Sequence, residues 1–183
     1  MDVKLKDLLV ERRSAIYKGW FTAIMETYPT DTSGFLQKQQ DQFANPVGHI
    51  IRQGVDGLLD ALIEEKDYSE GLPFLDDILK ARAVQDFTPS KAMNFIFLLK
   101  NVVRKEIGKE IRQNQITDSL FSFESKIDDL ALFAFNIYVK CREQIYELKS
   151  EELKRMTYLL LKKSNLAYEI PAQEFELKTK DNN

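Results

Sequence analysis

The stretch Asp86-Phe-Thr-Pro-Ser-Lys-Ala-Met-Asn-Phe-Ile-Phe-Leu-Leu-Lys-Asn-Val-Val-Arg104 decides the fold of this chain of 183 residues. Thr88 can cap the free N–H groups at the start of a helix, and Pro89 fits the opening turn, where a missing N–H costs nothing. On a helical wheel, apolar residues cover more than half of the circumference: Ala92, Met93, Phe95, Ile96, Phe97, Leu98, Leu99, Val102, Val103 and Ile107. Such a helix must be packed by others on several sides. We therefore expect an all-α fold with this helix, ending near Asn114, at its centre.

The composition bounds the class of protein. The chain is 44% hydrophobic and 30% charged, which is typical of a globular protein with a core of its own. The net charge is -3, whereas proteins that bind nucleic acids usually carry a basic surface. No apolar run approaches the ~20 residues that span a bilayer, and the N-terminus lacks the apolar segment of a signal peptide. We expect a cytoplasmic protein that binds no nucleic acid and does not insert into membranes.

Hydrophobic periodicity predicts a bundle of five to six helices in one domain, residues 1–164, followed by a flexible tail over 165–183. In chain order, helices are expected at 3–28, within 35–44 (a short helix), at 45–65 and at 73–84. The central helix described above and a long helix from about Asp118 follow. Asn45 and Pro46 form a typical helix start.

The long helix carries a row of mostly apolar residues at alternating spacings of four and three: Phe123, Ile127, Leu130, Ala134, Ile137, Cys141 and Leu148. This repeat is typical of a helix that packs lengthwise along a partner. A second group of apolar and aromatic residues predicts that the middle of the long helix is also covered on a second side: Leu132, Phe133, Phe135 and Tyr138. After Ser150 the apolar stripe changes phase, so either a separate short helix begins there or the long helix bends.

Candidate sites for chemistry are few. His49 is the only histidine, and helical spacing places it with Gln53, Asp56 and Asp60, opposite the apolar stripe of its helix. We expect a solvent-facing or locally hydrogen-bonded histidine rather than a ligand of haem or a metal. Cys141 lies on the apolar row of the long helix, where a thiol is expected to be a core side chain. We therefore predict no catalytic residues, no metal site and no cofactor.

An internal apolar cavity is the alternative that the sequence leaves open. Phenylalanines are frequent in the central and long helices, and Phe95, Leu99, Phe133 and Ile137 could line a pocket between the two. In that case the protein would bind a small ligand or haem, with His49 as the only imidazole.

Three blocks of sequence together carry a resemblance to a known family. They are Leu8-Leu-Val-Glu-Arg-Arg13 with Trp20 and Thr27-Tyr-Pro29, then Phe43-Ala-Asn-Pro-Val-Gly-His-Ile-Ile-Arg52, then Arg82-Ala-Val-Gln-Asp-Phe-Thr-Pro-Ser90 running into Phe95-Ile-Phe-Leu-Leu-Lys100. From about residue 5 to about residue 145 the chain resembles the N-terminal domain family of the RsbRD-type RsbT co-antagonists, helical sensory modules of the bacterial stressosome. The residues that match the signature blocks are Asn45, Pro46, His49, Asp86, Thr88 and Pro89.

The resemblance implies an input domain for stress-response signalling that has no catalytic activity. It also implies a relation to the non-haem globin-like domains of stressosome sensors, which pair through their terminal helices. In those sensors the last helix joins a STAS domain, for which 183 residues leave no room, so we expect a stand-alone sensor or adaptor. We expect a homodimer, with a protein partner in a signalling complex. The predicted dimer interface consists of Ile145, Leu148, Leu153, Met156 and Leu160.

Overall fold

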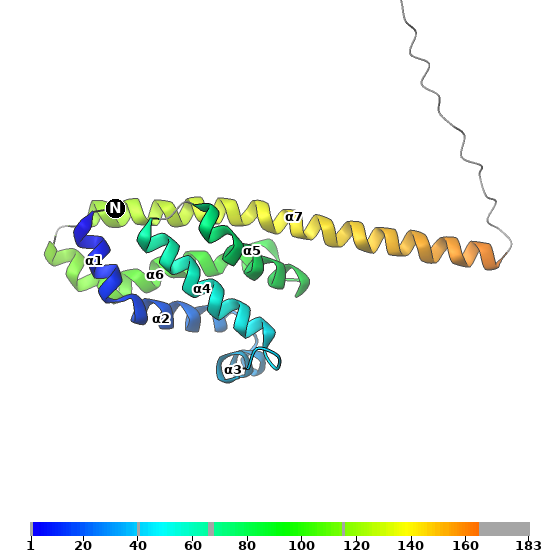
Figure 1. Cartoon of the computed structure of the whole chain (residues 1–183), viewed down its shortest axis with the longest axis horizontal. Coiled ribbons are helices and arrows are strands. Elements are labelled where there is room, and N and C mark those ends of the chain that lie inside the picture. The colour runs from blue at the N-terminus through cyan, green and yellow to red at the C-terminus, as the bar shows by residue number, and fades with distance from the viewer. Residues whose placement is uncertain (1, 40, 66–67, 115, 165–183) are drawn as a thin grey trace, which may run out of the picture. The chain divides into compact units, whose positions relative to one another are not determined.

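The computed structural model describes residues 2–39, 41–65, 68–114 and 116–164, which form seven α-helices and no β-strand (Figure 1). The helices are α1 (Val3–Glu11), α2 (Arg13–Met25), α3 (Thr30–Lys38), α4 (Pro46–Glu64), α5 (Tyr68–Val84), α6 (Pro89–Asn114) and α7 (Thr117–Lys163). The all-α prediction with a long C-terminal helix is confirmed. The tail predicted over 165–183 lies outside the described residues.

The prediction of a single helix over 3–28 is wrong, because the chain breaks at Arg12. Its φ and ψ of -92° and 3° leave the helical region, and its side chain donates a hydrogen bond of 3.1 Å to Glu110 on α6. The apolar stripe keeps its phase across the break, from Leu9 to Ile16, both of which are buried. Periodicity alone therefore could not reveal the break.

Two other helices begin earlier than predicted. The polar residues after Pro29, which lie between the helices predicted at 3–28 and within 35–44, form the first turns of α3, which ends at Lys38. Helix α5 begins at Tyr68 and contains Pro73, which was expected to start it. The start of α4 is confirmed, since Asn45 Oδ1 accepts a hydrogen bond of 2.8 Å from the Gly48 amide and Pro46 occupies the first turn.

A first compact unit extends to Gln144 and contains the core. Helix α4 packs along α5, and α2 packs against α4 and α6. Close approach of α4 and α5 depends on Gly54, where an added Cβ would lie 2.5 Å from the Ile78 side chain. The expected central position of α6 is confirmed by Phe95 and Leu99, which are fully buried.

One face of α6 and one face of α7 are more exposed to solvent than the helical wheels predicted. Phe97 on α6 is exposed, as are Leu132, Phe133 and Phe135 on α7, so only Tyr138 of that predicted second face is buried. The buried side chains of α7 in this unit instead follow the predicted row through Phe123, Ile127, Leu130, Ala134 and Cys141.

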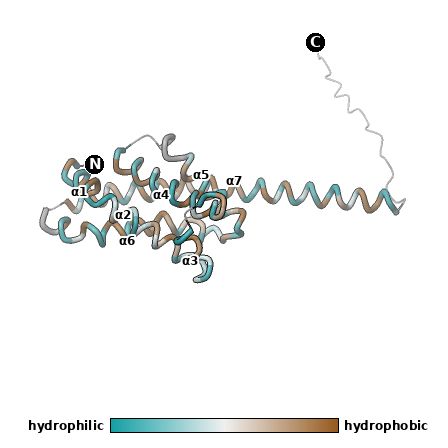
Figure 2. The backbone as a smooth tube through the Cα atoms, turned by 60° about the horizontal axis from the view of Figure 1, so that its bottom comes forward, coloured by the Kyte–Doolittle hydropathy of each residue, from teal (hydrophilic) through white to brown (hydrophobic). Residues whose placement is uncertain are grey.

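The second compact unit begins at Ile145, and its described part is a single helical segment that ends at Lys163. The change of phase after Ser150 is therefore accommodated without a break in α7. Apolar and polar residues alternate along it, as the brown and teal colours in Figure 2 show. Every described side chain from Tyr146 onward is exposed.

Candidate functional site

The turn between α5 and α6, residues Gln85–Thr88, lies at the centre of one signature block. Asp86 adopts a left-handed backbone conformation, with φ of 56°, which Asp tolerates better than most residues with a side chain. The Phe87 amide donates to the Arg82 carbonyl at 3.2 Å, which closes the turn onto the end of α5. Pro89 then starts α6, and the Thr88 carbonyl accepts the first helical hydrogen bond, 2.8 Å from the Ala92 nitrogen.

Arg82 on α5 ties three helices together from a fully buried position. Its guanidinium donates to the Lys91 carbonyl of α6 at 3.0 Å and to Thr27 Oγ1, after the end of α2, at 3.3 Å. Among the described residues no carboxylate forms an ion pair with it, and its Nε has no hydrogen-bond partner. Burial away from water therefore lowers the pKa of Arg82.

Aromatic rings take the place of a counter-ion around this cation. The guanidinium carbon lies 4.9, 5.0 and 5.5 Å from the ring centroids of Phe87, Phe95 and Tyr28. The electron-rich faces of such rings attract a desolvated cation. We call these three rings around the guanidinium the Arg82 cage. The backbone of Phe95 is also joined to α2, because its carbonyl accepts a hydrogen bond of 2.6 Å from Trp20 Nε1.

Helix α7 holds the same turn from its other side. The Tyr138 hydroxyl donates a hydrogen bond to the Phe87 carbonyl. One helical turn further along, Arg142 donates to the Ala83 carbonyl at 3.0 Å and to Asp86 Oδ1 at 2.6 Å. A shift of this part of α7 along its axis would break these three hydrogen bonds, so the position of α7 depends on the conformation of the turn.

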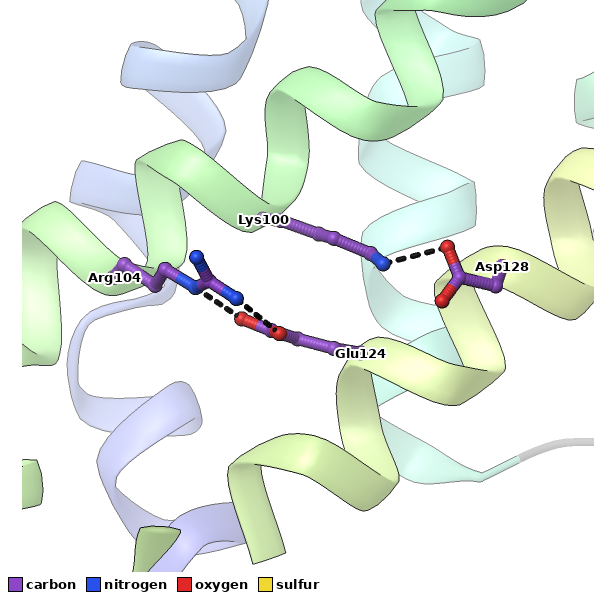
Figure 3. A network of polar contacts seen from close by, with 4 residues as sticks. All are labelled: Lys100, Arg104, Glu124 and Asp128. Atoms are coloured by element: carbon purple, nitrogen blue, oxygen red, sulfur yellow. Dashed lines mark hydrogen bonds and ion pairs between the residues drawn. The ribbon is translucent and has the colours of Figure 1, made fainter.

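A ladder of two ion pairs joins α6 and α7 (Figure 3). Arg104 Nε and Nη2 donate to the two carboxylate oxygens of Glu124 at 2.5 and 2.6 Å, and Lys100 Nζ donates to Asp128 Oδ1 at 2.5 Å. On each helix the two residues are four positions apart, so they share one face. The hydrogen bond to Glu124 raises the pKa of Arg104.

The other signature block fixes the end of α3 to the start of α4. While Asn45 Oδ1 caps α4, its Nδ2 donates to the Leu36 and Gln39 carbonyls at 3.0 and 2.8 Å. Arg52 Nη2 donates to the same two carbonyls, at 2.8 and 3.1 Å. Carbonyl groups at the end of α3 that have no partner within the helix are thus satisfied by the side chains of Asn45 and Arg52.

His49, the remaining signature residue of that block, is half-buried near the start of α4. On the polar face that it was expected to share, Asp56 and Asp60 accept hydrogen bonds from Arg13 of α2 at 2.7 and 2.5 Å. In the part of the chain that the structure describes, no three His, Cys, Asp or Glu side chains form a group that could hold a metal ion.

The residues of the predicted pocket differ in their exposure. Phe95 and Leu99 are fully buried on α6, whereas Phe133 on α7 is exposed and Ile137 is half-buried. The Phe95 ring lies 6.4 Å from the Trp20 ring, centroid to centroid, and is one of the three rings around Arg82. A ligand pocket lined by all four remains a prediction.

Cys141 is buried on α7, and burial raises the pKa of its thiol. A thiol with a raised pKa forms less of the reactive thiolate at neutral pH. Its neighbour Arg142 is directed to the α5–α6 turn, as described above.

The segment Ile145–Lys163 of α7 presents apolar side chains to solvent. Large apolar residues between 41% and 67% exposed occur throughout it: Tyr146, Leu148, Leu153, Met156, Tyr158, Leu159, Leu160 and Leu161. Ile145, at its start, is half-buried. Four of the five residues of the predicted interface are thus exposed. The prediction left out Tyr146 and Leu159, which helical spacing places on the same side as Leu153 and Met156.

Comparison with known proteins identifies the family. No helix among the described residues is both long and apolar enough to cross a bilayer. Searches of curated proteins and of solved structures gave no significant match. The family model described as the RsbT co-antagonist protein rsbRD N-terminal domain matches residues 14–153, which include the blocks Phe43–Arg52 and Arg82–Ser90 and most of α7. The chain therefore belongs to the family of rsbRD N-terminal domains, a family of signalling input domains.

Proposed function

We propose that this protein is a non-enzymatic signalling module that forms a homodimer through the apolar face of Ile145–Lys163. The family supports a role in stress-response signalling. The observation that supports the mode of action is the exposure of eight large apolar side chains on this one helical segment. Helices that present a continuous apolar stripe are usually covered by a partner, because contiguous exposed apolar surface is rare on monomeric proteins.

The apolar side chains of the segment can contribute a driving force of the same order as the cost of association. Fully burying one Leu side chain contributes about 1.5–3 kcal/mol. A symmetric pair covers Leu148, Leu153, Met156 and Leu160 on both chains, so its gain is comparable with the ~4–15 kcal/mol that association costs. We infer a reversible dimer rather than an obligate one.

The first compact unit supplies the part of the module that could respond to a signal. Tyr138 and Arg142 of α7 hold the α5–α6 turn, and Arg82 joins that turn to α2 and α6. A change in the packing of this core would alter the contacts that hold α7 in place. The dimer, or a protein bound to the apolar face, would then transmit that change.

Multi-angle light scattering at micromolar concentrations tests the proposal. We expect a dimer for the full chain and a folded monomer for the double variant Leu153→Glu/Leu160→Glu. Leu132→Glu is the matched control, because Leu132 is an equally exposed leucine of α7 outside the segment. A monomeric full chain, or a dimer that survives the double variant, would show that this face does not mediate self-association.

A further inference from the structure

Charge is distributed unevenly along the segment Ile145–Lys163. Its first part, 145–152, contains Glu147, Glu151 and Glu152 against the single cation Lys149. Its second part, 153–163, contains four cations and no carboxylate: Lys154, Arg155, Lys162 and Lys163. All of these side chains are exposed. The segment thus has an acidic half and a basic half.

The acidic half and the basic half each interact electrostatically with the part of a neighbouring helix that lies beside them. At 1.5 Å per residue each half is ~12–16 Å long, which exceeds the screening length of ~8 Å at physiological salt. Packed helices lie ~8–10 Å apart, so charges on one helix still interact with those on the other. In a parallel pair, each half would lie beside its own copy and repel it. In an antiparallel pair, the acidic half lies beside the basic half.

Two polar residues within the apolar face favour the same orientation. Helical spacing places Lys149 and Glu152 between Leu148 and Leu153 on the wheel. Symmetry sets a parallel pair of identical helices in register, so Lys149 would face Lys149 and Glu152 would face Glu152. An antiparallel pair centred on the segment separates these like charges, because Lys149 lies level with Leu159 of the other chain and Glu152 lies level with Met156.

We propose that two copies of this chain pair through Ile145–Lys163 in an antiparallel orientation. This inference rests on the proposed function, because it specifies the geometry of the same dimer. The apolar residues occur in both halves of the segment, with Leu148 in one and Leu160 in the other, so the apolar face is buried in either orientation. Charge complementarity therefore decides the orientation, as opposite charges at e and g positions do in coiled coils.

Cysteine cross-linking in the full chain distinguishes the two orientations. In a Cys141→Ala background, Leu148→Cys and Leu160→Cys are prepared separately, one of them with a tag that changes its size. Residue 148 is level with its own copy in a parallel dimer. In an antiparallel dimer centred on the segment it lies about 18 Å from its own copy along the axis and level with residue 160.

We expect a short bismaleimide to join Leu148→Cys to Leu160→Cys in the mixture and to give little product with either variant alone. Efficient cross-linking of each variant to itself would show a parallel pair and overturn the orientation while leaving the dimer intact. A dimer by light scattering without any of these products would show that the interface lies elsewhere. A monomer by light scattering would overturn the proposed function itself.

The effect of salt gives an independent readout. We expect the dissociation constant of the antiparallel dimer to rise several-fold between about 0.05 M and about 0.5 M NaCl, because salt screens the attraction between the halves. A dissociation constant that falls over this range would indicate like charges side by side, and therefore the parallel orientation.

Discussion

The guanidinium of Arg104 on α6 forms two parallel hydrogen bonds with the carboxylate of Glu124 on α7, although only one of the two side chains is buried. The Glu124 side chain is 6% exposed and that of Arg104 is 54% exposed. Arg104→Ala would leave a buried carboxylate without its partner, so we expect the free energy of unfolding to fall by about 2 kcal/mol. Urea denaturation followed by circular dichroism measures this loss.

Lys100→Met is the matched control for that variant, because it keeps an apolar stem in place of the Lys100 side chain, which is only 19% exposed, and removes the ammonium. Lys100 pairs with Asp128 one turn away on the same ladder, but the Asp128 side chain is 52% exposed. Water replaces the lost partner, so we expect a loss below about 1 kcal/mol. Equal losses for the two variants would contradict the account of Glu124 as the buried member of the network.

Arg82→Lys should destabilise the first compact unit although it conserves the charge. A lysine ammonium cannot contact three rings and reach the Lys91 carbonyl and Thr27 Oγ1 at once, because it lacks the planar fork of a guanidinium. We expect a loss of about 2 kcal/mol in urea denaturation, from unsatisfied buried groups. Lys80→Arg, an exposed exchange between the same residue types on α5, should change stability little. An Arg82→Lys variant as stable as the parent would show that the cage tolerates any cation.

Substitutions of Asp86 test whether its left-handed backbone conformation contributes more to the free energy of unfolding than its ion pair with Arg142. Asp86→Asn keeps a residue that tolerates positive φ and removes only the charge that faces Arg142, so we expect a loss below about 1 kcal/mol. Asp86→Val adds a branched side chain at φ of 56°, which should cost about 1–2 kcal/mol more. The order of the two melting temperatures checks this prediction, and a reversed order would contradict it.

The Cys141 thiol should react slowly with alkylating reagents in the folded protein. Burial raises its pKa, so at pH 8 it forms less thiolate than a free cysteine. We expect alkylation by iodoacetamide to be slower in the native protein than in urea. Because the unfolded thiol loses its proton at lower pH than the folded one, the thiol's contribution to stability is complete below the unfolded pKa and is lost as pH rises above it. Native alkylation as fast as that in urea would instead indicate a reactive site.

Local signals in the sequence predicted the elements of the fold better than their contacts. Asn45-Pro46 and Thr88-Pro89 mark helix starts because both signals depend on adjacent residues: α4 begins at Pro46 with Asn45 as its side-chain cap, and α6 begins at Pro89. The Arg82 cage was not predicted, since Tyr28 and Phe95 lie far from Arg82 in the sequence. No spacing rule connects such residues. Asp86, four residues after Arg82, pairs with Arg142 instead, so no local pattern indicates that Arg82 is buried among aromatic rings.

The exposed apolar residues show a second limit. Leu132 and Phe135 were expected to be covered within the bundle because a wheel reports polarity and not the position of neighbouring helices. In the segment from Ile145 the same reasoning predicted an interface, and the structure leaves those side chains exposed. Sequence therefore predicts that a face is apolar, whereas only a structure shows whether the same chain covers it.

Native mass spectrometry of the full chain tests the central claim most directly, because it reports stoichiometry and any retained small molecule together. We expect a homodimer at micromolar concentrations, and a monomer for Leu153→Glu/Leu160→Glu. A full chain that stays monomeric throughout this range would contradict the claim that Ile145–Lys163 mediates self-association.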